Sequence, residues 1–129
     1  MPLHVDMIGF VSENIQRSVE FYRLLGLPIA DVPDGEDHHE YQQPNGLRLA
    51  WDTLSLMKQL DPEYDHSSGQ RVGVAFLCDS PAHVDELHAK AIAAGAGSKM
   101  DPWDAFWGQR YAVIVDPDGY KIDLFAPLS

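Results

Sequence analysis

Apolar and polar residues alternate near both ends of the chain, and each alternating segment predicts a β-strand. Residues 3–11 form one such segment, and residues 111–115 and 121–125 form two more around Asp118-Gly119. This dipeptide favours the tight turn of a β-hairpin. If the two strands pair directly across the turn, one face of the hairpin carries Tyr111, Val113, Asp123 and Phe125. A face that mixes a carboxylate with aromatic rings suits neither a core nor bulk solvent, so we expect it to form the floor of a cleft.

Two helices with similar boundaries follow the first strand and a later apolar strand at residues 71–78. Ser12 or Asn14 can cap the first helix, and Ser80 followed by proline begins the second. Glycine at position 26 or 95 can end each helix in the left-handed conformation. The two serines are 68 residues apart and the two glycines 69 apart, which predicts an internal duplication.

The duplication gives a single domain, residues 1–129, made of two modules at 1–52 and 71–129 with a connector at 53–70. Each module is predicted to contain a strand, a helix and three further strands. In the first module, residues 27–43 are expected to supply two short strands. Residues 100–110 are rich in Pro, Asp and Gly, and we expect a polar loop there.

Composition and charge limit the cellular compartment and the kinds of binding partner that we expect. A chain of 129 residues with 45% hydrophobic content can bury a core, and its one cysteine, Cys78, excludes a disulfide framework. The start of the sequence resembles no signal peptide, so we expect a soluble cytoplasmic protein. The formal net charge of -11 disfavours nucleic acid and anionic membranes as partners and would attract a cationic ligand.

The segments VSENIQRSVEFYRLLGL and YAVIVDPDGYKIDLFAPL resemble the vicinal oxygen chelate superfamily. This superfamily includes glyoxalase I, extradiol dioxygenases, fosfomycin resistance enzymes and bleomycin resistance proteins. The resemblance implies an α+β fold in which two tandem βαβββ modules form a curled mixed sheet around a cleft. It also implies a homodimer in which two chains complete each cleft.

Metal-using members of the superfamily take ligands from the first, fourth, fifth and eighth strands. Carried over by position, these places fall on Asp6, Ala50, Gly73 and Asp123. Alanine and glycine offer no ligand, whereas a catalytic metal usually has about three protein ligands. We therefore expect no metal cofactor. The alternative is a divalent ion held by Asp6, Asp123 and an imidazole, that of His4 or His38.

The predicted ligand-binding set combines carboxylates, one guanidinium group and aromatic rings. Its members are Asp6, Phe10, Arg48, Trp103, Phe106, Trp107, Tyr111, Asp123 and Phe125. Arg48 is expected to meet an anionic group or to form an ion pair, with Asp123 as the candidate partner. Trp51 lies on the same strand face as Leu47 and Leu49 and is therefore assigned to the core.

Three functions fit this inventory. The first is a homodimeric protein, resembling bleomycin resistance proteins, that sequesters an aromatic or cationic small molecule without metal. The second is a metal-dependent glyoxalase-like lyase or isomerase, or a dioxygenase-like enzyme. The third is a dimeric structural or regulatory module whose cleft has no dedicated ligand.

Overall fold

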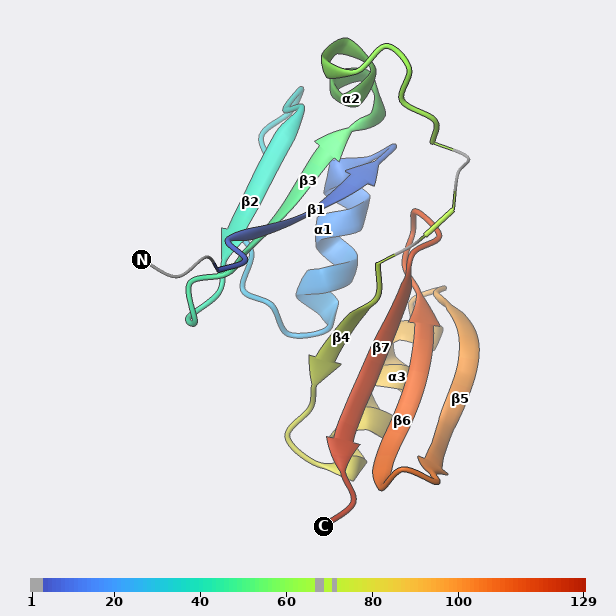
Figure 1. The fold of residues 1–129 in the computed structure, drawn as a ribbon. Coiled ribbons are helices and arrows are strands. Elements are labelled where there is room, and N and C mark those ends of the chain that lie inside the picture. The colour runs from blue at the N-terminus through green and yellow to red at the C-terminus, as the bar shows by residue number, and fades with distance from the viewer. Residues whose placement is uncertain (1–3, 67–68, 71) are drawn as a thin grey trace. The chain divides into compact units, whose positions relative to one another are not determined.

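The computed structural model describes residues 4–66, 69–70 and 72–129 and divides the chain into two compact units (Figure 1). Unit 1 comprises Met1–Ser68 and unit 2 comprises Gly69–Ser129. Each unit contains a mixed sheet and a long helix, so the predicted α+β fold class is confirmed. The common cleft between the modules stays a prediction, and each unit is described by itself.

Unit 1 contains β1 (Met7–Ser12), α1 (Ile15–Leu24), β2 (His38–Gln42), β3 (Arg48–Thr53) and α2 (Leu54–Leu60). The central strand of its sheet is β3, which runs parallel to β1 and antiparallel to β2. A tight turn joins β2 to β3, and its glycine, Gly46, has a φ of 95°. The sheet of unit 1 therefore mixes parallel and antiparallel pairs.

The core of unit 1 lies between β3 and α1. The helix begins after Asn14, whose side-chain oxygen accepts a backbone hydrogen bond from its first turn at 3.1 Å. On the inner face of the helix, Val19 and Tyr22 are buried. The Tyr22 ring lies 5.5 Å from that of Trp51, which has no exposed surface and stacks on Phe10 at 5.9 Å between ring centroids. The assignment of Trp51 to the core is confirmed.

One expected strand of unit 1 is absent from the region where it was predicted. Residues 27–43 form β2 and otherwise a loop, in place of two strands. Pro28 and Pro33 lack the N–H group that a central strand would need. The backbone bonds there are local, such as that from Glu36 to the Pro33 carbonyl at 3.3 Å. Unit 1 is thus a strand, a helix and two strands, followed by the short α2.

Unit 2 contains β4 (Val74–Leu77), α3 (Pro81–Ala93), β5 (Gly97–Ala105), β6 (Gln109–Val115) and β7 (Lys121–Pro127). This is the predicted strand, helix and three-strand order, and the strands lie in the sheet order β4-β7-β6-β5. Among the residues that the structure describes, no helix has the length and apolar character needed to cross a membrane.

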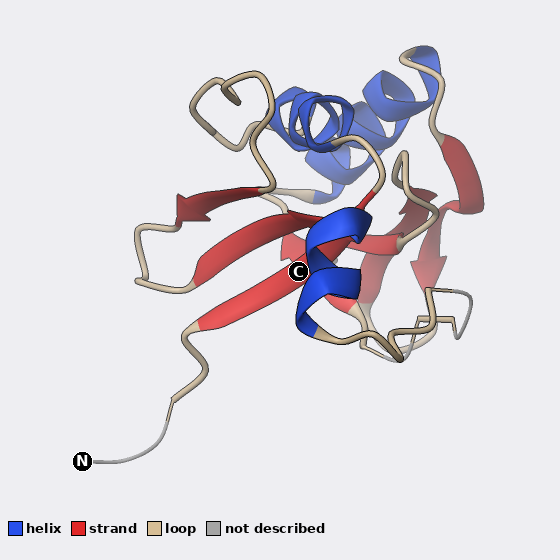
Figure 2. Ribbon diagram, turned by 90° about the horizontal axis from the view of Figure 1, so that it is seen from above, coloured by secondary structure: helices blue, strands red, loops and turns tan. Residues whose placement is uncertain are grey.

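The two faces of the unit 2 sheet have different roles. Tyr111 pairs with Phe125 and Val113 with Asp123, so the predicted register of the final hairpin is confirmed. The opposite face packs on α3, which lies behind β6 and β7 in Figure 1. Ile114, on this face, is fully buried. Viewed from above, the long helix of each unit lies on one side of that unit's strands (Figure 2).

The expected loop at residues 100–110 is largely a strand. β5 continues to Ala105 and pairs with β6, with register shifts between Ser98 and Trp103. Because β5 is an edge strand, one side of its backbone needs no partner strand, and a proline such as Pro102 is tolerated there. Trp103 therefore sits on a sheet, and the turn between β5 and β6 carries the next two aromatic residues.

Candidate ligand-binding site

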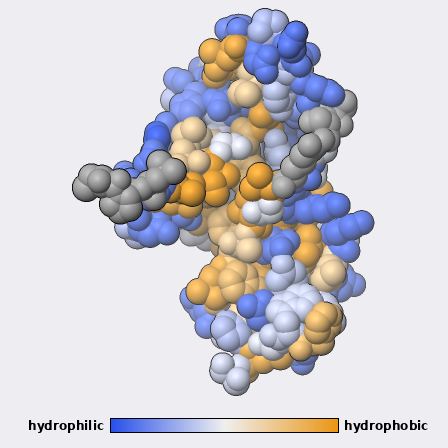
Figure 3. Space-filling model, viewed as in Figure 1, coloured by the Kyte–Doolittle hydropathy of each residue, from blue (hydrophilic) through white to orange (hydrophobic). Residues whose placement is uncertain are grey.

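The open face of unit 2 is the sheet face away from α3. It carries Tyr111 and Val113 of β6 and Asp123 and Phe125 of β7, with Leu77 of β4 beside Phe125. Figure 3 views this side of the strands, and hydrophobic and pale residues gather there over unit 2. Leu77 is 69% exposed, so apolar surface on this face is available to a ligand or a partner.

Asp123 is the carboxylate on the open face of the β6–β7 hairpin. The hydroxyl group of Tyr111 donates a short hydrogen bond to Asp123 Oδ2. Oδ1 accepts no hydrogen bond from the part of the chain that the structure describes. One oxygen of the carboxylate is therefore held in place, and the other is free to meet a ligand.

The Tyr111 side chain keeps its proton under physiological conditions. Burial, followed by the hydrogen bond to Asp123, raises the pKa of Tyr111 to about 12. The phenol therefore acts as a permanent donor to the carboxylate and is not a general base near neutral pH. Tyr111 therefore holds the Asp123 carboxylate in a fixed position, and the pair by itself has no identifiable role in proton transfer.

Three further aromatic rings adjoin this pair and form a continuous cluster of four with the Tyr111 ring. The aromatic cluster consists of Trp103, Phe106, Trp107 and Tyr111. Trp107 is its centre, because its ring lies 5.5 Å from that of Trp103, 4.9 Å from Phe106 and 5.2 Å from Tyr111, each nearly perpendicular. Edge-to-face contacts of this kind are favourable arrangements for aromatic rings.

Much of the aromatic cluster is exposed. Phe106 is 90% exposed and Trp107 47% exposed, although the indole N–H of Trp107 is fixed by a 2.9 Å hydrogen bond to Gln109. Large aromatic surface that is both oriented and accessible can stack on a planar ligand or attract a cation through the ring faces. The cluster therefore supplies binding area next to the Asp123 carboxylate.

A shallow pocket of about 410 Å³ lies on the other side of Asp123. It is lined by Gln70, Val72, Gly73, Gly119, Lys121 and Asp123, all of unit 2. The Gln70 side chain joins two parts of the pocket wall, because it donates to the Val72 carbonyl at 2.8 Å and accepts from the Lys121 backbone at 2.7 Å. The open face thus continues into a polar recess.

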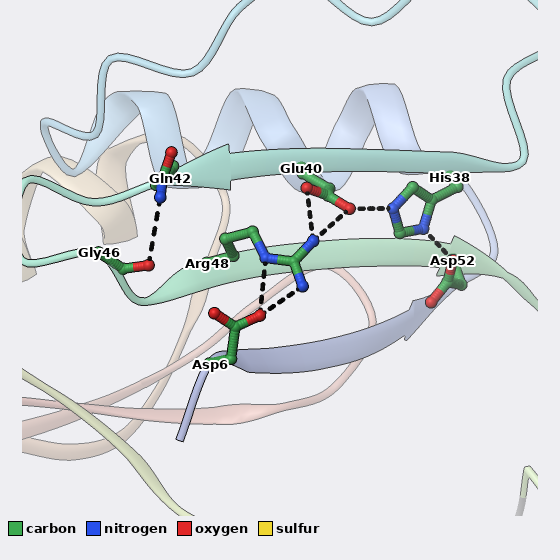
Figure 4. Close-up of polar contacts among 7 residues, drawn as sticks. All are labelled: Asp6, His38, Glu40, Gln42, Gly46, Arg48 and Asp52. Carbon is green, nitrogen blue, oxygen red and sulfur yellow. Dashed lines mark hydrogen bonds and ion pairs between the residues drawn. The ribbon is translucent and has the colours of Figure 1, made fainter. Parts of the chain in front are cut away.

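A second polar cluster lies on the sheet of unit 1, and its side chains come from β2, from β3 and from Asp6, the residue before β1 (Figure 4). The guanidinium group of Arg48, on β3, binds Asp6 Oδ2 at 2.6 Å and Glu40 Oε2 at 2.9 Å. His38, on β2, contacts Glu40 at 2.8 Å through Nε2 and Asp52 at 2.5 Å through Nδ1. The cluster therefore ties β2 and the start of β1 to the central strand.

Both ring nitrogens of His38 face carboxylates. Since an ionised carboxylate can only accept, this geometry favours the imidazolium form, which donates from both nitrogens. The hydrogen bond to Glu40, then that to Asp52, raises the pKa of His38 above its ordinary value of 6.5. The same contact with His38, followed by that with Arg48, lowers the pKa of Glu40.

We expect the protein to lose stability as pH rises through the folded-state pKa of His38. A histidine whose pKa is raised on folding contributes its full stabilisation below the unfolded pKa and loses it above the folded one. The urea midpoint should therefore be lower at about pH 9 than at about pH 6, and less so in His38→Gln. His39→Gln is the matched control, because the His39 ring instead contacts the Ala30 carbonyl. An equal decrease in the unaltered protein and in His38→Gln would contradict this role.

The structure brings the predicted site residues of unit 2 together and gives two of those in unit 1 other roles. Phe10 was expected to bind the ligand, but it is 4% exposed and stacks on Trp51 in the core, so its ring is not available to a ligand. Arg48 does form an ion pair, although its partners are Asp6 and Glu40 and not Asp123. Glu40 is a member of this cluster that the sequence interpretation missed.

The donor groups at the superfamily's metal positions do not fit a catalytic metal site. Ala50 and Gly73 have no donor side chain, Asp6 is neutralised by Arg48, and Asp123 is bound by Tyr111. In the ranges that the structure describes, no three His, Cys, Asp or Glu side chains are grouped so that they could hold an ion. Of the two imidazoles in the alternative metal set, His4 is exposed and precedes β1, and both ring nitrogens of His38 contact carboxylates of unit 1.

Two similar units, each with a helix on one face of a mixed sheet and polar groups on the other, define the class of this α+β protein. A sequence model of the Glyoxalase/Bleomycin resistance protein/Dioxygenase superfamily matches residues 4–124. The chain belongs to this superfamily, as the resemblance in its sequence predicted. No curated protein matches the sequence.

Solved structures of the same superfamily share the fold. A glyoxalase/bleomycin resistance protein/dioxygenase from Nocardioides is 24% identical with a TM-score of 0.75, covering 100% of this chain and 86% of the other. A glyoxalase-related enzyme from Fulvimarina pelagi is 21% identical with a TM-score of 0.81, covering 95% and 87%. A family enzyme from Burkholderia phytofirmans is 19% identical with a TM-score of 0.77, covering 95% and 98%. At these identities the similarity concerns the fold.

Proposed function

We propose that this protein binds a small aromatic cation on the open face of unit 2 and sequesters it without a metal ion. The main support for the proposal is the position of the Asp123 carboxylate, which Tyr111 holds beside an exposed aromatic cluster. A positive charge on the ligand would meet the free oxygen of Asp123, and its ring would pack on the cluster. Binding of this kind needs no reacting group.

The net charge of the chain supports the same ligand class. At -11 the protein attracts cations over a distance of about one Debye length, roughly 10 Å at 0.1 M salt. An anionic ligand would be repelled by this field and would find the Arg48 guanidinium already bound by two carboxylates. A cation, in contrast, could pair with Asp123, because one oxygen of this carboxylate has no partner within the described residues.

Sequestration in the manner of bleomycin resistance proteins, a cytoplasmic location and a homodimer complete the proposal. The buried Cys78 supports a reducing compartment, because it is a lone thiol with no disulfide partner available in the sequence. The exposed Leu77 on the edge strand β4 offers apolar surface for a second chain. A metal-dependent lyase, isomerase or dioxygenase is the competing function, and it requires donors that positions 50 and 73 lack.

The test uses phenyltrimethylammonium, whose positive charge is permanent and whose ring is planar. We expect it to change the tryptophan fluorescence in a saturable way, because Trp107 lies in the aromatic cluster. Tetramethylammonium, which lacks the ring, and benzyl alcohol, which lacks the charge, should each bind more weakly. If all three compounds leave the fluorescence without a saturable change, the proposed function is wrong.

A further inference from the structure

Lys121 gives the open face of unit 2 a positive group that the proposed function does not use. It lies two residues before Asp123 on β7, and residues at this spacing point to the same face about 7 Å apart. Its side chain is exposed and forms no ion pair within the described ranges. In a chain with 20 acidic residues, this unpaired ammonium group beside a pocket is available to an anion.

The backbone that carries Lys121 is fixed by Gln70. The Gln70 amide accepts from the Lys121 N–H at 2.7 Å and donates to its carbonyl at 3.1 Å. Both contacts anchor the start of β7 to the segment that precedes β4. The backbone of Lys121 is therefore held against the pocket wall, and the strand β7 sets its spacing from Asp123.

Gly73 leaves room in the same pocket. A Cβ atom at this position would meet no atom within 4 Å, and its φ is not in the left-handed region. The backbone would thus accept a larger residue without strain. The absence of a side chain keeps open the space between Lys121 and Asp123 that a ligand would enter.

These groups follow one another along the open face as a cation, a carboxylate and an aromatic cluster. Lys121 comes first on β7, Asp123 is next, and Tyr111 holds Asp123 and adjoins the remaining rings. A ligand complementary to this order has an anionic group, then an ammonium group, then a ring. A ligand with only a positive charge could pair with Asp123 but would leave the Lys121 ammonium group without a partner.

We propose that the ligand is an aromatic zwitterion whose anionic group pairs with Lys121, whose ammonium group pairs with Asp123 and whose ring packs on the aromatic cluster. This proposal rests on the proposed function, because it assumes the same site and adds the anionic group. It defines the chemical class of the ligand as an aromatic amino acid or a compound with the same arrangement of groups. The pocket beside Asp123 then holds the charged end of the ligand.

Calorimetric titration with three related probes tests this inference. Phenylalanine has all three groups, phenethylamine lacks the carboxylate, and 3-phenylpropionate lacks the ammonium group. We expect phenylalanine to bind about threefold to fivefold more tightly than phenethylamine, as suits an exposed ion pair at Lys121, and 3-phenylpropionate to bind most weakly. Lys121→Met should remove the advantage of phenylalanine and leave phenethylamine binding undiminished.

Gly73→Leu is a second variant that needs no change of charge. By filling the pocket it should weaken phenylalanine more than phenethylamine, while the unfolding midpoint changes little. If phenethylamine binds as tightly as phenylalanine, or if Lys121→Met keeps the difference between them, the zwitterion assignment is wrong and the aromatic-cation function stands. If none of the three probes nor phenyltrimethylammonium binds, both proposals fall together.

Discussion

Replacing Asp123 with asparagine is expected to weaken binding of phenyltrimethylammonium by about tenfold to a hundredfold. Contacts that involve a charged group contribute about 1.5–3 kcal/mol, and each 1.4 kcal/mol is about tenfold in affinity. Asp123 is partly buried on an apolar face, where water screens the contact less than at an open surface. Fluorescence titration of the variant and the unaltered protein measures the change.

Glu86→Gln is the matched control for the Asp123 variant. Glu86 is an exposed residue of α3, so its replacement removes the same charge from the other side of the sheet. We expect its effect on affinity to be small because long-range interactions between exposed charges are screened by salt. Equal affinities for Asp123→Asn and Glu86→Gln would show that Asp123 does not contact the ligand.

Replacing Trp51 with alanine is expected to destabilise the protein by about 3–5 kcal/mol. Truncation of a buried aromatic residue loses its transfer free energy and leaves a cavity. Trp51 has no exposed surface, and its ring lies 5.9 Å from Phe10 and 5.5 Å from Tyr22. Since small domains have only about 5–15 kcal/mol of stability, urea unfolding should register a large decrease in the midpoint.

Trp107→Ala makes the same substitution in the aromatic cluster, where we expect a loss of binding and little loss of stability. Trp107 is 47% exposed at the turn between β5 and β6, so its loss should change stability by only about 0.5 kcal/mol. It should nevertheless weaken phenyltrimethylammonium binding, because Trp107 is the centre of the aromatic cluster. If Trp107→Ala unfolds the protein while Trp51→Ala does not, the assignment of core and site is reversed.

The final hairpin shows how much of the site could be predicted from sequence. The turn at Asp118-Gly119 requires a residue with positive φ, and Gly119 has a φ of 91°. Once the turn was placed, the strict alternation of a strand fixed which residues share a face with Asp123. This argument found Tyr111 and Phe125. It could equally have found Lys121, which has the same alternation, but it could not find Gln70, whose contacts cross 51 residues of sequence.

Phe10 shows where the same argument failed. Asp6 precedes β1, which begins at Met7, and alternation holds only within a strand, so Asp6 does not indicate which face Phe10 occupies. Within β1, Phe10 lies opposite Trp51 and shares its buried face. Asp6 lies before the strand, so strand alternation does not fix the direction of its side chain. That side chain reaches Arg48, while Phe10 points into the core.

Local composition was also a poor guide at the two irregular segments. Residues 100–105 contain aspartate and proline yet form part of the edge strand β5, because tertiary pairing with β6 outweighs weak strand propensity. Residues 27–43 were expected to form two strands, but only β2 is present, and residues 27–37 form a loop with local hydrogen bonds. In both cases the outcome depends on which neighbour is available to pair, and a single sequence does not give that information.

The most direct test of metal-free binding is a calorimetric titration of phenyltrimethylammonium into protein treated with a chelator, repeated after addition of zinc or nickel. The arrangement of Asp123, Tyr111 and the aromatic cluster predicts the same affinity in both states, because no metal ligand takes part. Binding that is lost in the chelator and restored by one metal ion per chain would contradict the account.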